Sequence, residues 1–254
     1  RLAVGRILGV DDLGAEGGGL LVPERLWIWG SFGSVEARQT ALGGDRESSL
    51  FNNSAIKGNA QLFPSNSMSL ALHRSDKTRT GIGAGPTREP DAQQTQHART
   101  SIWKLEDSQV LGPNLHVSLL ASRLDGGFRA LPSSSPLAEP LLAADGVWRG
   151  SYAKSEVERD ATQQQVEART FSTLGQITHE ARLGLSNRVF DSADQERWGP
   201  RDLIHIDGAN TGTSYDIVRA LRPGRIAVEQ TSRSIWLQDD LRADRLTLTL
   251  GLRF

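Results

Sequence analysis

The chain has 254 residues, enough for one large domain or two smaller ones, with 37% hydrophobic side chains and a mean hydropathy of -0.38. Its 29 basic and 30 acidic residues give no basic excess, which argues against a nucleic-acid partner, and the lack of cysteine excludes disulfides, thiolate metal sites and cysteine nucleophiles. No segment approaches the roughly 18 apolar residues of a transmembrane helix. Residues 1–6 contain neither an initiator Met nor the apolar core of a signal peptide.

Apolar residues recur at every second position along the chain, and this spacing predicts β-strands rather than helices. Taken in order, the alternating segments are residues 26–32, 68–72, 115–121, 181–185 and 246–254. The last is the clearest, because one face carries only Leu and Phe while the other carries Arg, Thr and Gly: Leu246, Leu248, Leu250, Leu252 and Phe254 against Arg245, Thr247, Thr249, Gly251 and Arg253. A strand with lipid on one side and water on the other would show this pattern.

The connections between these segments have two lengths. Short turns are predicted at residues 23–25, 64–66, 112–114 and 242–244, and long polar stretches at residues 78–100, 131–146 and 191–214. Outer-membrane barrels have short periplasmic turns at one rim and long extracellular loops at the other. A soluble β-sandwich or propeller would alternate as well, although the absence of a short repeat counts against a propeller.

Several phrases, in a shared order, resemble the barrel of TonB-dependent outer-membrane receptors, especially their Oar-like group. The phrases lie at residues 17–22, 24–32, 83–90, 103–110, 124–128, 144–152, 179–184, 237–240 and 244–248. The resemblance covers nearly the whole chain from Glu24 to Phe254, and it departs from the group's pattern where a proline is missing from residues 17–22.

The resemblance implies an incomplete part of a barrel of about 22 strands. Residues 1–254 would form one partial barrel domain of about a dozen antiparallel transmembrane strands, and the strand that ends at Phe254 would be internal. The plug domain and the segment that contacts TonB would precede Arg1. The implied function is ligand binding at extracellular loops and active import of an iron chelate, an oligosaccharide or a similar bulky nutrient across the outer membrane of a Gram-negative bacterium.

No catalytic, cofactor or metal site is predicted, and no ligand residue can be assigned. The five histidines are scattered without metal-ligand spacing and are interpreted as lumen-facing or loop residues: His73, His97, His116, His179 and His205. The adjacent pairs Glu106–Asp107 and Asp239–Asp240 point to opposite faces of a strand and cannot work as an acid/base pair. The chain is therefore not expected to be an enzyme.

For three further features, an ordinary structural explanation competes with a functional one. Residues 81–86 imitate a phosphate-binding loop, but Pro86 and the missing helix pattern favour a plain loop. Residues 207–216 contain oxygen ligands suited to Ca²⁺, yet their spacing is not that of an EF-hand, so a polar loop is favoured. Five tryptophans near strands fit either a membrane-interface girdle or ordinary packing: Trp27, Trp29, Trp103, Trp148 and Trp236.

The partners expected from this interpretation are outer-membrane lipid, the TonB system acting through a plug, and an unidentified nutrient. Two alternatives stay open: a passive porin or adhesin barrel, and a soluble secreted all-β binding module. A plug encoded directly upstream would exclude the passive barrel, and solubility without detergent would favour the secreted module. An isolated partial barrel would leave two open edges, and we expect that it cannot insert stably alone.

Overall fold

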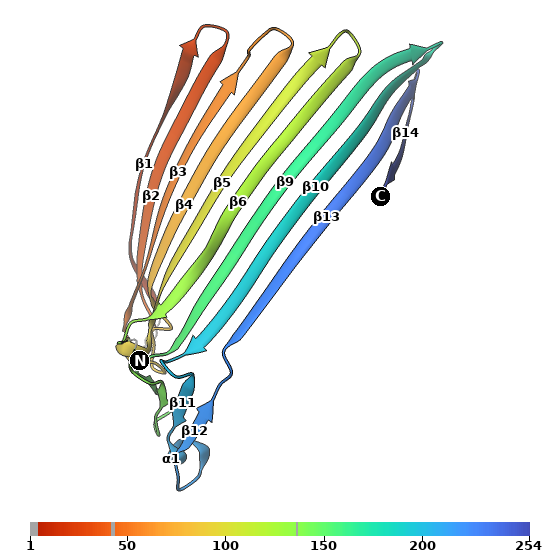
Figure 1. Cartoon of the computed structure of the whole chain (residues 1–254). Coiled ribbons are helices and arrows are strands. Elements are labelled where there is room, and N and C mark those ends of the chain that lie inside the picture. The colour runs from red at the N-terminus through yellow and green to blue at the C-terminus, as the bar shows by residue number, and fades with distance from the viewer. Residues whose placement is uncertain (1–4, 42–43, 136) are drawn as a thin grey trace.

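The computed structural model describes residues 5–41, 44–135 and 137–254, which form two β-sheets (Figure 1). The main sheet has ten strands, each antiparallel to its neighbours, in the order β1 (Arg6–Val22), β2 (Leu26–Thr40), β3 (Arg46–Ala60), β4 (Asn66–Ile82), β5 (Gln94–Leu111), β6 (Leu115–Pro132), β9 (Ala153–Leu174), β10 (Ile177–Trp198), β13 (Gly224–Ala243) and β14 (Leu246–Arg253). The small sheet has the order β12 (Ile217–Ala220), β11 (Leu203–Ile206), β7 (Leu141–Leu142) and β8 (Trp148–Arg149).

The main sheet is an open, partial barrel wall whose tilted strands lie side by side (Figure 1). β1 and β14 are its two edges, and they do not pair with each other within the described residues. The expected antiparallel barrel architecture is confirmed, with ten strands in the sheet where about a dozen were expected. Apart from β14, the strands contain 15 to 22 residues, more than the roughly 9–11 needed to cross a bilayer.

The extra strand length corrects the predicted loops. Residues 78–82, 94–100 and 191–198 were expected in long loops, but they extend β4, β5 and β10. The loops that remain are residues 83–93, 133–152 and 199–223, together with a shorter connection at residues 41–45. All four join strands at the same end of the sheet, here called the loop rim.

Five tight turns occupy the opposite end, the turn rim. The four predicted turns are confirmed, and a fifth, between β9 and β10 at Gly175, was missed by the sequence pattern. Glu24 and Asp244 hold the left-handed conformation at two of these turns, with φ of 60° and 49°. Aspartate tolerates this conformation through its short polar side chain, whereas glutamate there is unusual. Short turns at one rim and longer loops at the other give the predicted asymmetry.

The strand register gives the sheet two chemically different faces. The apolar face carries Leu246, Leu248, Leu250 and Leu252 of β14 and continues across the paired positions of every strand. Apolar residues prevail on this face in the half next to the turn rim and form a band, which polar residues such as Asp107 interrupt on several strands. In β10 they run from Ile177 to Leu185, interrupted by His179, and the next residue on this face is Asn187. This length matches a tilted membrane-spanning strand.

Beyond the band, the same face becomes polar. Arg74, Arg123 and Arg233 are among the first residues past the apolar positions of their strands. Towards the loop rim both faces of the sheet therefore carry charged or hydroxyl side chains, as expected for strands that continue into water. The opposite surface, the polar face, is rich in Ser, Gln and charged residues along most of its length.

The main sheet has no second layer among the described residues. The buried hydrophobic residues are few, and all lie at or near the loop rim: Ala92, Ala130, Ala143, Ala153, Ile204 and Ile206. The Leu, Ile and Val side chains of the apolar band are largely exposed; Leu183 and Leu252, for example, expose 49% and 64% of their surface. A soluble protein rarely leaves so large an apolar surface uncovered.

The tryptophans do not form the girdle that was one of the two explanations offered. Of the five considered, Trp103 lies on the apolar face, while Trp27, Trp29 and Trp236 lie on the polar face and Trp148 lies in β8. Successive side chains of a strand point to opposite faces, so the positions of Trp27, Trp29 and Trp236 in their strands place these rings away from the apolar surface. Neither of the two helices among the described residues, η1 (Pro90–Ala92) and α1 (Gly208–Thr211), is long and apolar enough to cross a membrane.

Candidate functional site

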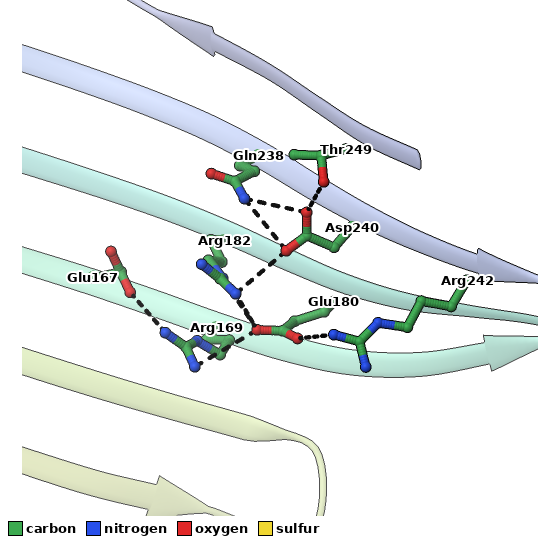
Figure 2. Close-up of polar contacts among 8 residues, drawn as sticks. All are labelled: Glu167, Arg169, Glu180, Arg182, Gln238, Asp240, Arg242 and Thr249. Carbon is green, nitrogen blue, oxygen red and sulfur yellow. Dashed lines mark hydrogen bonds and ion pairs between the residues drawn. The ribbon is translucent and has the colours of Figure 1, made fainter. Parts of the chain in front are cut away.

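Six charged side chains on the polar face form an ion-pair cluster near the turn rim (Figure 2). Its members are three carboxylates and three guanidinium groups from β9, β10 and β13: Glu167, Arg169, Glu180, Arg182, Asp240 and Arg242. Glu180 is central, because its carboxylate lies 2.5 Å from Nη2 of Arg182, 3.6 Å from Nη1 of Arg169 and 3.8 Å from Nη2 of Arg242. The cluster is charge-balanced and joins three neighbouring strands.

The carboxylates of this cluster are more enclosed than the arginines. The side chains of Glu180 and Asp240 are 14% and 12% exposed, against 64% for Arg242. Asp240 also accepts hydrogen bonds from Thr249 Oγ1 at 2.6 Å and from Gln238 Nε2 at 3.2 Å (Figure 2). Nε of Arg169 is buried and has no hydrogen-bond partner. The ion pairs therefore hold these charged groups in place on the polar face, and one N–H donor, Nε of Arg169, has no acceptor.

A polar hollow of about 610 Å³ lies beside the cluster on the same face. Its lining combines side-chain amides, two arginines and one indole: Gln163, Gln165, Gln238, Arg188, Arg253 and Trp236. The Trp236 ring lies directly over Gly184, its cross-strand partner, where any Cβ would overlap it. Arg253 lies 5.9 Å from the centre of that ring. These groups could hold a polar or anionic ligand through hydrogen bonds.

The loops at the loop rim are joined into a compact structure, here called the rim unit, made of residues 83–93, 137–152 and 199–223. The small sheet connects two of these loops, since β7 pairs in parallel with β11 and antiparallel with β8. Backbone bonds between Thr87 or Glu89 and Trp148 attach the third loop, at 2.9 and 3.0 Å. Arg149 strengthens the junction by contacting Glu89 and Asp145 at 2.7 and 2.8 Å.

Ionised groups anchor the rim unit. Asp202 is 5% exposed and receives hydrogen bonds from Arg197 Nη2 at 2.7 Å and from the backbone N–H of Trp198 at 3.0 Å. The Arg197 guanidinium, helped by that N–H, lowers the pKa of the Asp202 carboxyl. The Arg149 guanidinium likewise lowers the pKa of Asp145 in the loop before β8. Both carboxylates therefore stay charged at neutral pH and hold their loops.

An aromatic cluster lies where the rim unit meets the sheet. Tyr152 packs edge-on against Trp148 and Trp198, with ring centres 5.2 and 4.7 Å apart. The Arg88 guanidinium stacks 3.7 Å from the centre of the Tyr152 ring. Trp198 belongs to the polar face of β10, so the cluster lies at the loop-rim end of that face. Aromatic rings with a stacked guanidinium can hold planar or anionic ligands.

The histidines are placed differently from one another. His73 and His116 lie on the polar face as predicted, and His116 Nε2 lies 2.6 Å from Ser108 Oγ. The prediction is wrong for His97 and His179, which lie on the apolar-face side of their strands. His205 lies in the connection between β10 and β13, where it belongs to the short strand β11. His179 can occupy its position because Nδ1 lies 2.9 Å from the carboxylate of Asp239. Among the described residues, no three metal-binding side chains come together.

The paired carboxylates point apart, as predicted. Asp107 and Asp239 lie on the apolar face near the turn rim, whereas Glu106 and Asp240 lie on the polar face. Asp107 accepts a hydrogen bond from Asn66 Nδ2 at 2.6 Å. Neither Glu106–Asp107 nor Asp239–Asp240 can therefore act as an acid/base pair, because the sheet separates the two carboxylates of each pair.

The two imitations of ligand loops are loops only in part, because residues 81–82 end β4 and residues 208–211 form the short helix α1. Gly83 and Gly85 hold positive φ angles in the connection after β4, as the loop interpretation requires. In the segment that offered oxygen ligands, Asp207 caps α1 by accepting from the N–H of Ala209 at 2.9 Å. Asp216 accepts from the N–H of Gly208 at 3.1 Å. Both carboxylates are engaged with backbone amides.

The ion-pair cluster and the aromatic cluster were not predicted. A signal for the first exists, since an acidic residue is followed two positions later by Arg in three strands: 167 and 169, 180 and 182, and 240 and 242. That spacing puts both charges on one face. The aromatic cluster combines residues 148, 152 and 198, and no local pattern connects them.

No family model and no curated protein matches the sequence. Solved structures do resemble the fold. They include the outer membrane transporter YddB from Escherichia coli, with a TM-score of 0.75 and 8% identity over 96% of this chain, and the siderophore receptor PiuA from Acinetobacter baumannii, with 0.65 and 12% over 98%. A third is FpvA of P. aeruginosa bound to a pyoverdine–iron complex, with 0.65 and 13% over 99%.

The chain has the fold of part of the barrel of TonB-dependent outer-membrane receptors. It spans 33% of the length of YddB, 41% of PiuA and 36% of FpvA. The receptor-barrel fold confirms the fold class predicted from the sequence, and the neighbours are transporters and receptors rather than enzymes. Assignment to the Oar-like group stays a prediction, because nothing tests it.

Proposed function

We propose that this chain is part of the barrel wall of an outer-membrane receptor that binds a bulky nutrient and imports it with energy supplied through TonB. The observation that carries the proposal is the two-faced sheet: a band of exposed apolar residues on one face, charged and amide side chains on the other, and, within the part of the chain that the structure describes, no apolar core that covers the band. Such a sheet suits a wall with lipid outside and a polar lumen inside.

Two features support directional transport over passive passage. The aromatic cluster with Arg88 lies at the loop-rim end of the polar face, where a ligand arriving through the loops would first meet the wall. The ion-pair cluster lies at the other end of the same face, with enclosed carboxylates and an unused donor on Arg169. A plug domain resting on the lumen wall would find there charged groups to pair with.

The ligand class follows from the lining chemistry and from the neighbours. PiuA is a siderophore receptor, and FpvA was solved with a ferric pyoverdine. Arg88, stacked on Tyr152, and the two arginines that line the polar hollow, Arg188 and Arg253, favour an anionic or hydroxyl-rich ligand over an apolar one. Iron chelates and oligosaccharides both meet this requirement.

The test is uptake by cells that express the native gene containing this chain, using a panel of labelled ferric chelates and oligosaccharides. We expect uptake of one class, lost both in a strain without TonB and in a strain lacking the gene. Uptake that persists without TonB would instead establish a passive porin. A protein found in the soluble fraction without detergent would establish the secreted binding module.

A further inference from the structure

A hollow of about 490 Å³ lies on the apolar face over β2 to β6, where the apolar band meets the charged region towards the loop rim. Its shape comes from small residues next to large ones: Gly30, Ser54 and Ser101 beside Ile56, Leu72 and Trp103. The register sets Gly30 opposite Ile56 and Leu72 opposite Trp103. Its volume lies within the roughly 300–1,000 Å³ of small-ligand sites, and its surface is mostly apolar.

Arginines border this hollow on the side of the loop rim. Arg74 is part of its lining, and both Arg74 and Arg99 donate from Nε to the carboxylate of Asp76 at 2.7 Å. Two guanidinium groups thus share one carboxylate, which leaves a net positive charge. The Nη groups of these two arginines donate no hydrogen bond to another described residue, and their side chains are 51% and 66% exposed.

The next arginine along the border is neutralised. Arg123, the cross-strand neighbour of Trp103, lies 2.6 Å from Asp125. The positive charge is therefore concentrated at Arg74 and Arg99. Guanidinium groups bind phosphate through paired N–H donors, and their free Nη groups supply this geometry.

We propose that this hollow is a binding site for an anionic membrane lipid with a terminal phosphate, which is not esterified to a choline-type headgroup, with an acyl chain in the hollow and the terminal phosphate held by Arg74 and Arg99. The inference rests on the proposed function, because it requires the apolar face to lie in a bilayer. The position fits the depth of lipid headgroups. Arg74 follows directly after the apolar residues of β4, and Arg99 lies just beyond those of β5, separated from Trp103 on this face by Ser101.

A second apolar hollow provides an internal control. It has a volume of about 610 Å³ and is lined by residues of β9, β10, β13 and the C-terminal Phe254, including Val166, Leu185 and Ile235. Its only lining arginine is Arg233, whose Nε donates to Asn187 Oδ1 at 3.4 Å. It can accept an acyl chain, but it lacks a pair of arginines that share one acid.

The experiment uses the fluorescence of Trp103 in the native protein, reconstituted into vesicles. Among the strand tryptophans, Trp103 alone lies on the apolar face of the main sheet, so quenchers on acyl chains reach it selectively. Phosphatidic acid and phosphatidylcholine, both with brominated chains, are compared at equal mole fraction. We expect several-fold stronger quenching by phosphatidic acid, and loss of the quenchable component in W103F.

Three variants locate the site. R74Q/R99Q should remove the preference for phosphatidic acid, whereas R233Q should keep it. Gly30→Leu should weaken quenching by filling the hollow; a Cβ at position 30 would meet Ala55 O at 3.6 Å, an ordinary contact, so the fold should tolerate the change. The two kinds of variant test the phosphate and the acyl chain separately.

The remaining outcomes each refute a specific claim, either the phosphate site alone or the phosphate site together with the proposed function. Equal quenching of the native protein by both lipids would refute the phosphate site and leave the transporter proposal intact. A preference for phosphatidic acid that persists in R74Q/R99Q would also refute the phosphate site and leave the transporter proposal intact. If neither lipid quenches Trp103, the apolar face does not lie in lipid, and the proposed function fails together with the lipid site.

Discussion

The main sheet and the rim unit are built for different surroundings. The rim unit buries Ile204 and Ile206 of β11 and uses ionised side chains to join its loops, as a soluble domain does. The main sheet buries almost nothing apolar and presents its Leu, Ile and Val side chains outward. One chain thus combines a unit of three joined loops, which has a small buried core of its own, with a long wall whose apolar face needs a solvent other than water.

Substitutions can distinguish the main sheet from the rim unit experimentally. Changes on the apolar face should act through lipid, changes on the polar face through side-chain packing, and changes in the rim unit through local hydrogen bonds. The expected effects fall in that order.

The largest effect should come from Ile28→Arg, on the apolar face within the band of β2. A buried arginine near the bilayer midplane costs about 2–4 kcal/mol in a transmembrane barrel. We expect a lower urea midpoint for unfolding from vesicles and less inserted protein. Ser31→Arg is the matched control, because Ser31 lies on the polar face opposite Glu16. Equal losses in both variants would show that the apolar face does not meet lipid.

A smaller effect is expected for Gly184→Val on the polar face. Any side chain at this position must displace the Trp236 ring, and overpacking of this kind costs about 1–3 kcal/mol. The tryptophan emission should shift along with the unfolding midpoint. Gly251→Ala serves as the control, since its Cβ would lie 3.5 Å from the nearest atom. A Gly184→Val protein with unchanged stability and emission would show that Trp236 does not rest on Gly184.

Within the rim unit, Asp202→Asn should loosen residues 199–223 and leave the main sheet intact. Asparagine tolerates the left-handed backbone at this position, where φ is 55°, but its neutral amide cannot form the ion pair that Asp202 makes with Arg197. Hydrogen exchange should become several-fold faster in the rim unit alone. Faster exchange throughout the sheet would mean that the two regions are not independent.

The smallest effect is a pH dependence. The folded-state pKa of Asp202 is lowered, so its stabilising contribution is present above the ordinary carboxyl pKa of about 3.9 and is lost as the pH falls through the lower folded value. Exchange in the rim unit should therefore accelerate below about pH 4 in the native protein. Asp202→Asn should flatten that profile; an acid-induced acceleration of the same size in the variant would assign the effect to another group.

Alternation in the sequence identified segments of β2, β4, β6, β10 and β14, and these segments face two different environments. Alternation is clear in residues 115–121 and 246–254, which lie in the apolar band. It fails in the parts of β4, β5 and β10 near the loop rim, where both faces meet polar surroundings and no selection for alternation exists. Those residues look like loop in the sequence, and the predicted loops were too long for this reason.

The candidate site was less predictable than the fold. The acid–arginine spacing in β9, β10 and β13 was present in the sequence, but contact among Arg169, Glu180 and Arg242 depends on the register between strands. The rim unit depends on bonds between distant loops, such as Asn210 Nδ2 donating to the carbonyl of Ala143 at 2.9 Å. Neither register nor loop docking follows from local periodicity.

The order of strands in the main sheet has a consequence for how such walls change over evolution. Each strand pairs only with the strand before and after it along the chain, apart from the excursions that form the small sheet. A hairpin and its tight turn can therefore be duplicated or deleted without changing the pairing order of the remaining strands. Barrel circumference can change in steps of two strands, while the loops at one rim vary independently.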